Sequence, residues 1–230
     1  MKQYLQYLLL LCCVVSLWGL TSCEEDITDN EEFVNWKATN DAAFKSVLSH
    51  AHQAIAAAKA AHGNDWEQHC EWRAFRAFTQ APESEGKATD SVCVQIIRQG
   101  IGSGCPEYTD SVSINYLGRL HPSPSYPQGF VFDHSSPNSR VEDVFNPNFA
   151  QPAGLLVSNT VVGFTTVLQK MHIGDRWKAY IPNELGYRGA SMGELPAYSM
   201  LIFEMELKGY YRPGFGPNSP NRPLAITLEQ

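Results

Sequence analysis

The sequence predicts an α+β fold, in which an antiparallel β-sheet wraps around one short α-helix and an N-terminal helical segment precedes the sheet. Two segments, 111–116 and 201–208, alternate apolar and polar residues as half-buried strands do. Between them, the apolar residues of 161–171 recur at i, i+3, i+6, i+7 and i+10, which is helical spacing. Alternating strands with one short helix between them indicate an antiparallel sheet that packs on that helix.

The first 22 residues have the pattern of a lipoprotein signal peptide. Lys2 provides a positive charge, and 8–20 is uncharged and apolar but too short to span a bilayer, which takes roughly 20 apolar residues. The segment ends in Leu-Thr-Ser-Cys, 20–23, which resembles a bacterial lipobox. That resemblance implies that Cys23 becomes the lipidated first residue of the mature protein. The alternative is an ordinary secretory signal followed by a chance cysteine.

An acidic, polar tether, 23–32, follows the lipobox. Its first acidic residues, 24–26, resemble a tag that sends some lipoproteins to the cell surface, although acidic residues are also common in linkers. We therefore expect a protein anchored by lipid in the cell envelope, at the outer membrane, on its periplasmic or its surface-exposed side.

The next segment, 33–80, is predicted to be helical. Over 33–61 the residues expected on one helix face follow three- and four-residue steps, 54–61 is rich in alanine, and Gly63 suits a helix end. The face consists of Phe33, Trp36, Asn40, Phe44, Val47, Ala51, Ile55 and Ala58. The aromatic-rich stretch 66–78 fits a short helix or a strand equally well. Residues 81–88 have the composition of a flexible linker.

The main domain is expected at 90–210. Its first strand, 92–97, is apolar on both faces and should be covered on both, and 100–106 is a glycine-rich loop. The strand over 175–181 should end at Pro182, because proline lacks the N–H that a central strand donates. The tail, 211–230, is rich in proline and glycine and should be disordered or lie on the surface.

The cysteines argue against metal and redox chemistry. Of the six, Cys12 and Cys13 leave with the signal peptide, and Cys23 is the expected lipid site. The mature chain then has three further cysteines, Cys70, Cys93 and Cys105. Three thiols allow at most one disulfide, and no Cys-x-x-Cys spacing suggests zinc binding or thiol exchange. Cys93 lies in an apolar strand and should be a buried small side chain.

The charge of the chain excludes another class of function. The formal net charge is -7, and no basic stripe could neutralise the phosphates of a nucleic acid. We therefore expect no nucleic-acid partner.

Five sequence elements, in order, resemble the FKBP family of macrolide-binding peptidyl-prolyl cis-trans isomerases. They are Tyr116-Leu117-Gly118-Arg119-Leu120, Phe132-Asp133-His134-Ser135, Gly163-Phe164 with Met171-His172-Ile173-Gly174-Asp175, 181–187 and 201–207. The resemblance covers about 90–210. It implies the sheet-around-helix fold predicted above, isomerisation of X-Pro bonds in protein clients, and a macrolide as a ligand. Because isomerisation makes and breaks no bond, it requires no cofactor or metal.

The resemblance also assigns candidate site residues. It implies a proline pocket with Phe164 as the floor, in place of the family's Trp, with aromatic walls and with Tyr187 donating its hydroxyl to the substrate carbonyl. Val161 would offer a backbone N–H, Asp133 would lie at the edge, and Leu195 would belong to a flap. The complete set of candidates is Tyr116, Phe132, Asp133, Val161, Phe164, Tyr187, Leu195 and Phe203.

Three departures from the family pattern border the expected pocket. Arg188 follows Tyr187 where the family has glycine, so this turn could be rebuilt. The loop 121–129 is longer than usual. The segment 141–153 has no clear match to the family's phenylalanine-rich strand, although Phe145 and Phe149 could substitute for it.

Several functions and roles stay open at this point. The first is an active, lipid-anchored isomerase that assists the folding of exported proteins. The second is a catalytically weak FKBP-like binding module or chaperone for proline-containing segments, and the third is a surface lipoprotein that binds a host or glycan ligand. Some exported relatives in this family use an N-terminal helical arm for dimerisation, but the shortness of 33–61 favours a helix packed on its own domain.

Overall fold

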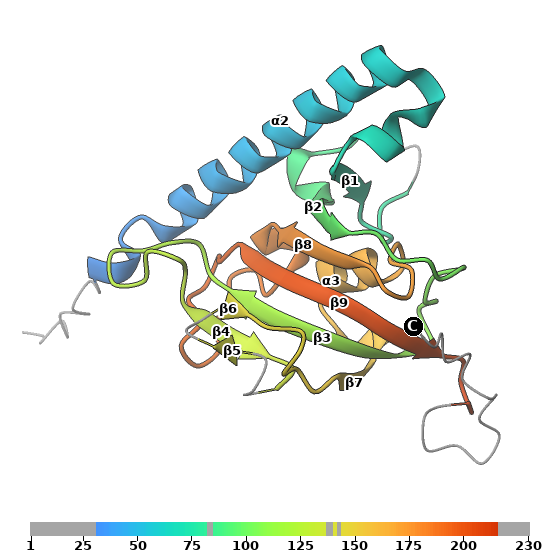
Figure 1. Cartoon of the computed structure of the whole chain (residues 1–230). Coiled ribbons are helices and arrows are strands. Elements are labelled where there is room, and N and C mark those ends of the chain that lie inside the picture. Colours follow the sequence, from blue (N-terminus) through green and yellow to red (C-terminus); the bar gives the residue numbers. More distant parts are fainter. Residues whose placement is uncertain (1–30, 82–84, 137–139, 142–143, 216–230) are drawn as a thin grey trace, which may run out of the picture. The chain divides into compact units, whose positions relative to one another are not determined.

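The computed structural model of the 230-residue chain describes residues 31–81, 85–136, 140–141 and 144–215 (Figure 1). The predicted signal peptide, Cys23, most of the tether and the tail beyond 215 lie outside these residues. The chain divides into two units, 1–34 and 35–230. The described part of the first unit contains the short 3-10 helix η1 (Glu31–Phe33), and the second unit holds the sheet and the helices α2 and α3.

A seven-stranded sheet forms the centre of the second unit, and the pairs within it are antiparallel. Its order is β1-β2-β8-β9-β3-β4, and β7 also pairs with β3. The strands are β1 (Trp72–Arg76), β2 (Ser91–Arg98), β3 (Ser111–Arg119), β4 (Val131–His134), β7 (Ala153–Leu156), β8 (Arg176–Ile181) and β9 (Leu201–Tyr211). A separate pair consists of β5 (Arg140–Val141) and β6 (Val144–Phe145).

The short helix α3 (Val162–Leu168) packs on one face of the sheet, which confirms the predicted α+β fold (Figure 1). It approaches closely because Gly163 has no side chain: a Cβ there would lie 2.2 Å from Cγ2 of Ile181 in β8. The helix ends at Leu168, earlier than predicted. The chain then tightens into i to i−3 hydrogen bonds from Lys170 and Met171, which carry it into the turn before β8.

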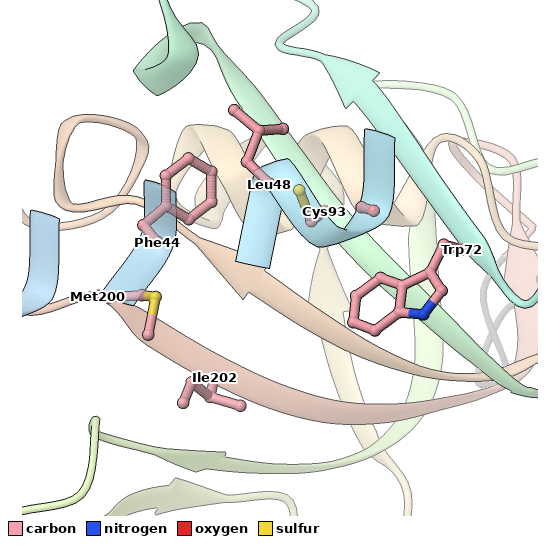
Figure 2. Packing of buried hydrophobic residues seen from close by; sticks show 7 residues of the cluster. Phe44, Leu48, Trp72, Cys93, Met200 and Ile202 are labelled. Carbon is pink, nitrogen blue, oxygen red and sulfur yellow. The ribbon is translucent and has the colours of Figure 1, made fainter. Parts of the chain in front are cut away.

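Helix α2 (Trp36–His62) packs on the opposite face. Phe44, Leu48 and Ala51 of α2 form one buried cluster with residues of the sheet and of the segment before β9, as Figure 2 shows. The sheet side of this cluster is Trp72, Cys93, Met200 and Ile202. Helix α2 therefore packs on its own domain, as its length favoured.

The aromatic-rich stretch that sequence could not assign contains a strand. After the 3-10 helix η2 (Gly63–His69), β1 pairs with the outer edge of β2, so a helical segment running to residue 80 is wrong over 72–76. The reason is tertiary: a short helix is only marginally stable on its own, whereas the edge of β2 offers hydrogen-bond partners to the backbone of a strand. Arg73 holds the turn into β1 by donating to the carbonyls of Glu67, Cys70 and Trp72.

The polar face of β9 is less exposed than its alternation predicted. Ile202 is buried under α2, and Glu206 is only 3% exposed. Hydrogen bonds to the Glu206 carboxylate come from Asn115 (2.9 Å) and Arg98 (2.5 Å). Burial tends to raise the pKa of Glu206, but these hydrogen bonds and the charges of Lys208 and Arg98 outweigh it, so the pKa is lowered.

The strand β2 is covered on both faces in its first half, as predicted. Val92, Cys93 and Val94 are fully buried, and burial raises the pKa of the Cys93 thiol to about 12. The prediction fails near the end of the strand, where Ile97 is 46% exposed. The register of β2 against β8 shifts between Ile96 and Arg98, so Ile97 has no paired residue in β8. All three cysteines of the described residues are free thiols.

Candidate active site

Four aromatic side chains from four different elements meet on the face of the sheet that carries α3. Phe203 of β9 is the hub: its ring centroid lies 4.9 Å from Phe164, 5.4 Å from Phe132 and 6.1 Å from Tyr116. Tyr116 and Phe164 are 5.9 Å apart. All four contacts are edge-to-face, the arrangement that aromatic quadrupoles favour. The structure therefore brings together the residues predicted as floor and walls, and we name these four the aromatic cluster.

Gly118 allows this cluster to form. It lies opposite Phe203 in the pairing of β3 with β9 and opposite Asp133 in the pairing with β4. A Cβ at Gly118 would lie 2.5 Å from the Phe203 ring and 2.9 Å from the Phe132 ring. The glycine of the Tyr-x-Gly element is thus required because two rings occupy the space of its side chain.

A hydrogen bond joins the cluster to the acidic candidate. The Tyr116 hydroxyl donates to Oδ2 of Asp133 at 3.2 Å, and the His134 amide donates to Oδ1 at 2.8 Å. Burial raises the pKa of Tyr116, and the charge of Asp133 and this hydrogen bond raise it further. Tyr116 therefore stays a neutral donor, and it holds the otherwise exposed Asp133 side chain in place.

Tyr187 follows the 3-10 helix η6 (Asn183–Leu185) in a tight turn. The carbonyl of Asn183 accepts hydrogen bonds from the amides of Gly186 and Arg188, both at 3.0 Å, so Tyr187 is fixed on both sides. Its side chain is half-buried. Burial raises the pKa of Tyr187, and the negative charge of Asp133 adds to the effect. The hydroxyl is thus kept as a hydrogen-bond donor close to Asp133.

Beside the aromatic cluster lies an open pocket of about 390 Å³. Its lining consists of Phe130, Phe132, Asp133, Tyr187, Met192, Gly193, Glu194 and Leu195. A larger cavity of about 710 Å³ lies between α2 and 86–91, but the described residues that line it include no Phe, Tyr or Trp and none of the predicted site residues. The smaller pocket is therefore the candidate site.

The predicted residues divide into two groups around this pocket. Phe132, Asp133, Tyr187 and Leu195 belong to the lining, and Phe132 also belongs to the aromatic cluster. The rest of that cluster is more than nine-tenths buried and does not line the pocket. Val161 is half-buried at the start of α3, where its carbonyl accepts from the Thr165 amide at 3.0 Å, and it is absent from the described lining.

The departures from the family pattern have structural explanations. Arg188 has φ 57°, so the turn keeps the left-handed backbone that glycine favours, now with an arginine in it. The long loop 121–129 is closed by reciprocal backbone hydrogen bonds between Ser123 and Tyr126. The Tyr126 ring then packs on Phe130 at 5.0 Å, and Phe130 reaches the pocket.

The suggestion that Phe145 and Phe149 replace the missing aromatic strand is wrong. Phe145 is buried against Leu117 and Val131. Leu117 points to the opposite face of β3 from Tyr116, because neighbouring strand residues alternate. Phe149 is 62% exposed.

Sequence reasoning missed Phe130, Met192, Gly193 and Glu194 of the pocket lining. Each lies within three residues of a predicted one, so their proximity was available as a signal. Within the described ranges, no three His, Cys, Asp or Glu side chains are grouped as metal ligands would be. No helix in that part of the chain is long and apolar enough to cross a membrane.

Part of the chain is similar to known proteins. Residues 102–208 match the sequence profile of the FKBP-type peptidyl-prolyl cis-trans isomerases. A macrophage infectivity potentiator of Trypanosoma cruzi is 32% identical over 136 residues, which cover 59% of this chain and 61% of that protein. The FKBP-type 22 kDa peptidyl-prolyl cis-trans isomerase of Escherichia coli is 34% identical over 115 residues, 49% of this chain and 47% of that protein.

An outer membrane protein MIP of Legionella longbeachae is 30% identical over 114 residues, 49% of this chain and 41% of that protein. The chain thus spans between about two fifths and three fifths of the length of these relatives. With the matched order of motifs, the sheet around α3 and the aromatic cluster, residues 102–208 belong to the FKBP-type peptidyl-prolyl cis-trans isomerase family.

Proposed function

We propose that this protein catalyses cis-trans isomerisation of X-Pro bonds and so assists the folding of exported proteins in the cell envelope. The observation that carries this proposal is the arrangement of Phe132, Asp133 and Tyr187 around one pocket against the aromatic cluster. An aromatic wall with very few polar groups is what this reaction needs.

The physical reason lies in the amide bond. Rotation about an X-Pro bond is slow because resonance imposes a barrier of roughly 18–20 kcal/mol, and unaided rotation takes tens to hundreds of seconds. The planar amide is more charge-separated than the twisted one. Excluding water from the bond therefore favours the twisted state, and no nucleophile, metal or cofactor takes part.

Each candidate has a role in this account. The proline ring would pack against Phe132 and Leu195, supported from behind by Tyr116, Phe164 and Phe203. Tyr187 would donate its hydroxyl to the substrate carbonyl and fix its orientation. Asp133 would orient the Tyr116 hydroxyl, and Val161 would offer its backbone N–H to the client chain, as the family resemblance implies.

The second candidate function is an FKBP-like binding module or chaperone for proline-containing segments. The specific observation in its favour is that the rings of Phe164 and Phe203 are almost fully buried and lie outside the pocket lining. A proline ring would then reach less of the aromatic cluster than catalysis requires.

A protease-free isomerisation assay on a short X-Pro peptide separates the two candidates. We expect catalysed isomerisation that a macrolide ligand inhibits. Binding of the peptide or the macrolide without acceleration of the cis-trans exchange would establish the binding module instead. Neither binding nor catalysis would refute both candidates.

We propose further that a lipid on Cys23 anchors the protein to the outer membrane, facing the periplasm or the cell surface. The lipobox-like sequence supports this, and one relative is named an outer membrane protein. The Cys23→Ser variant should leave the membrane fraction after signal cleavage, because the lipid would be its anchor. A processed variant that still sediments with membranes would refute the lipidation.

A further inference from the structure

Five of the eight residues that line the pocket belong to one segment, 183–200, which carries Tyr187 and the stretch 192–195. Apart from the short 3-10 helix η6 it has no helix or strand of its own. We name it the pocket segment. Two of its residues, Arg188 and Tyr198, have φ of 57° and 62°, a conformation that non-glycine residues hold only when their surroundings impose it.

Helix α2 contacts the pocket segment near the beginning and near the end of that segment. At the beginning, the Asn183 side chain donates to Oδ1 of Asp41 at 3.1 Å. At the end, Oδ1 of Asn40 accepts from the Met200 amide at 2.8 Å. The Trp36 indole N–H donates to the hydroxyl of Ser199 at 2.8 Å. These α2 residues all lie in the first two turns of the helix.

The contacts at Ser199 and Met200 are buried, and the contact between Asn183 and Asp41 is partly buried. Asn40 is 1% exposed, Ser199 3% and Asn183 5%. Asn40 is also held from its other side, because its amide donates to the Trp36 carbonyl at 2.7 Å. A buried polar group left without its partner is costly, so these pairs favour one position of the pocket segment over others.

The contact at Asn183 leads directly to Tyr187. Asp41 holds the Asn183 side chain, while the Asn183 carbonyl accepts from the amides on either side of Tyr187. Lys37 adds a second link, since it pairs with Asp41 and its ammonium lies 5.7 Å from the centre of the Tyr198 ring.

We propose that the start of α2 is part of the isomerase site, with Asn40 and Asp41 as positioning residues that hold the pocket segment and thereby the Tyr187 hydroxyl. This inference rests on the proposed function, because it assigns to α2 the placement of a residue of that site. Truncating α2 would then impair the pocket even though the helix lies on the opposite face of the sheet from the aromatic cluster.

Two measurements test the proposal on Asp41→Ala, Asn40→Ala and the matched control Ile55→Ala. Ile55 also packs α2 on the sheet but belongs to a later turn, outside the described contacts with the pocket segment. In hydrogen exchange, amides of 183–200 should exchange faster in the first two variants and at the wild-type rate in Ile55→Ala. Unchanged exchange in all three would overturn the proposal.

The second measurement is a double-mutant cycle on kcat/KM, at a temperature where every variant is folded. Asp41→Ala alone should lower kcat/KM roughly two- to tenfold, the value of about one hydrogen bond. In the Tyr187→Phe background the same substitution should have little effect, because the hydroxyl it positions is gone. An undiminished loss in that background would refute positioning through Tyr187.

The two measurements also separate this proposal from the proposed function. If the wild-type protein shows no isomerase activity, the function proposed above is wrong, and hydrogen exchange still decides whether α2 holds the pocket segment. If the wild type is active and exchange does not change, the function stands and the role of α2 is refuted.

Discussion

The two faces of the sheet are built from different kinds of contact. On the α3 face, rings from β3, β4, α3 and β9 meet edge to face. On the α2 face, an apolar cluster lies beside buried polar pairs such as Asn40 with Met200 and Asn115 with Glu206. The first face carries the aromatic cluster beside the candidate pocket, and the second carries the contacts between α2 and the pocket segment.

This difference has a consequence for mutations. Removing a ring on the α3 face should reduce both stability and activity, because that ring serves the core and the pocket. Removing an apolar side chain on the α2 face should reduce stability alone, unless the side chain touches the pocket segment.

Phe164→Ala and Trp72→Ala compare the two faces directly. The two side chains are 3% and 8% exposed, so each truncation should lower the free energy of unfolding by about 3–5 kcal/mol. Urea unfolding measures this loss. At a temperature where both variants are folded, Phe164→Ala should lose most of its isomerase activity and Trp72→Ala should keep it. Equal activity in the two variants would show that the proline does not depend on the aromatic cluster.

Glu206→Gln tests the buried charge on the α2 face. We expect a loss of about 1–2 kcal/mol at pH 7, the lower part of the range for hydrogen bonds to a charged group, since Arg98 is half exposed. The folded-state pKa of Glu206 lies below its unfolded value. The stabilisation is therefore complete above the unfolded pKa, roughly 4.3, and is lost as the pH falls through the folded pKa.

The free energy of unfolding of wild type and Glu206→Gln should be measured between pH 3 and 7, a range that includes the unfolded-state pKa of about 4.3. The difference between the two proteins should be constant at the upper end and shrink at the acidic end. Isomerase activity should be the same in wild type and variant at every pH at which both proteins are folded. A difference that grows on acidification would mean that Glu206 is not ionised in the folded protein.

Tyr187→Phe removes one hydroxyl from the pocket and keeps the ring. If the hydroxyl donates to the substrate carbonyl, kcat/KM should fall roughly two- to twelvefold, which corresponds to about 0.5–1.5 kcal/mol. An unperturbed tyrosine has a pKa of about 10, and the pKa of Tyr187 is raised above its ordinary value. The hydroxyl should therefore remain a hydrogen-bond donor at every pH below about 10, and the wild-type rate should not decline in that range. A loss of about a thousandfold or more would mean that Tyr187 acts as an acid, and the dry-pocket mechanism would be wrong.

Arg188→Gly should give the smallest effect and the opposite sign. Glycine removes the energy cost of the left-handed backbone, but it also raises the conformational entropy of the unfolded chain, which lowers stability. The first contribution is the larger, so we expect the free energy of unfolding to rise by about 0.5–1 kcal/mol. Arg188→Ala is the matched control, because it removes the same side chain and keeps the strain. An equal gain in both variants would place the effect in the side chain rather than in the backbone.

Sequence patterns were enough to predict the elements of the α3 face. Alternation over 111–116 and 201–208 identified the residues that share a face of β3 and β9, and helical spacing identified α3. Which aromatics meet was implied by the resemblance to the FKBP family, whose motifs occur in the same order in this sequence. Local periodicity added the direction of the side chains within each regular element.

The α2 face depended on the tertiary structure. Alternation could not reveal that Ile202 and Glu206 are covered, that 72–76 adds a strand at the sheet edge, or that Phe145 packs away from the pocket. The same limit applies to Asn40, which stands in an apolar helical stripe and accepts a hydrogen bond from Met200, 160 residues away. Periodicity states which residues share a face, but the element that covers that face is chosen by contacts between distant parts of the chain, and only folding decides them.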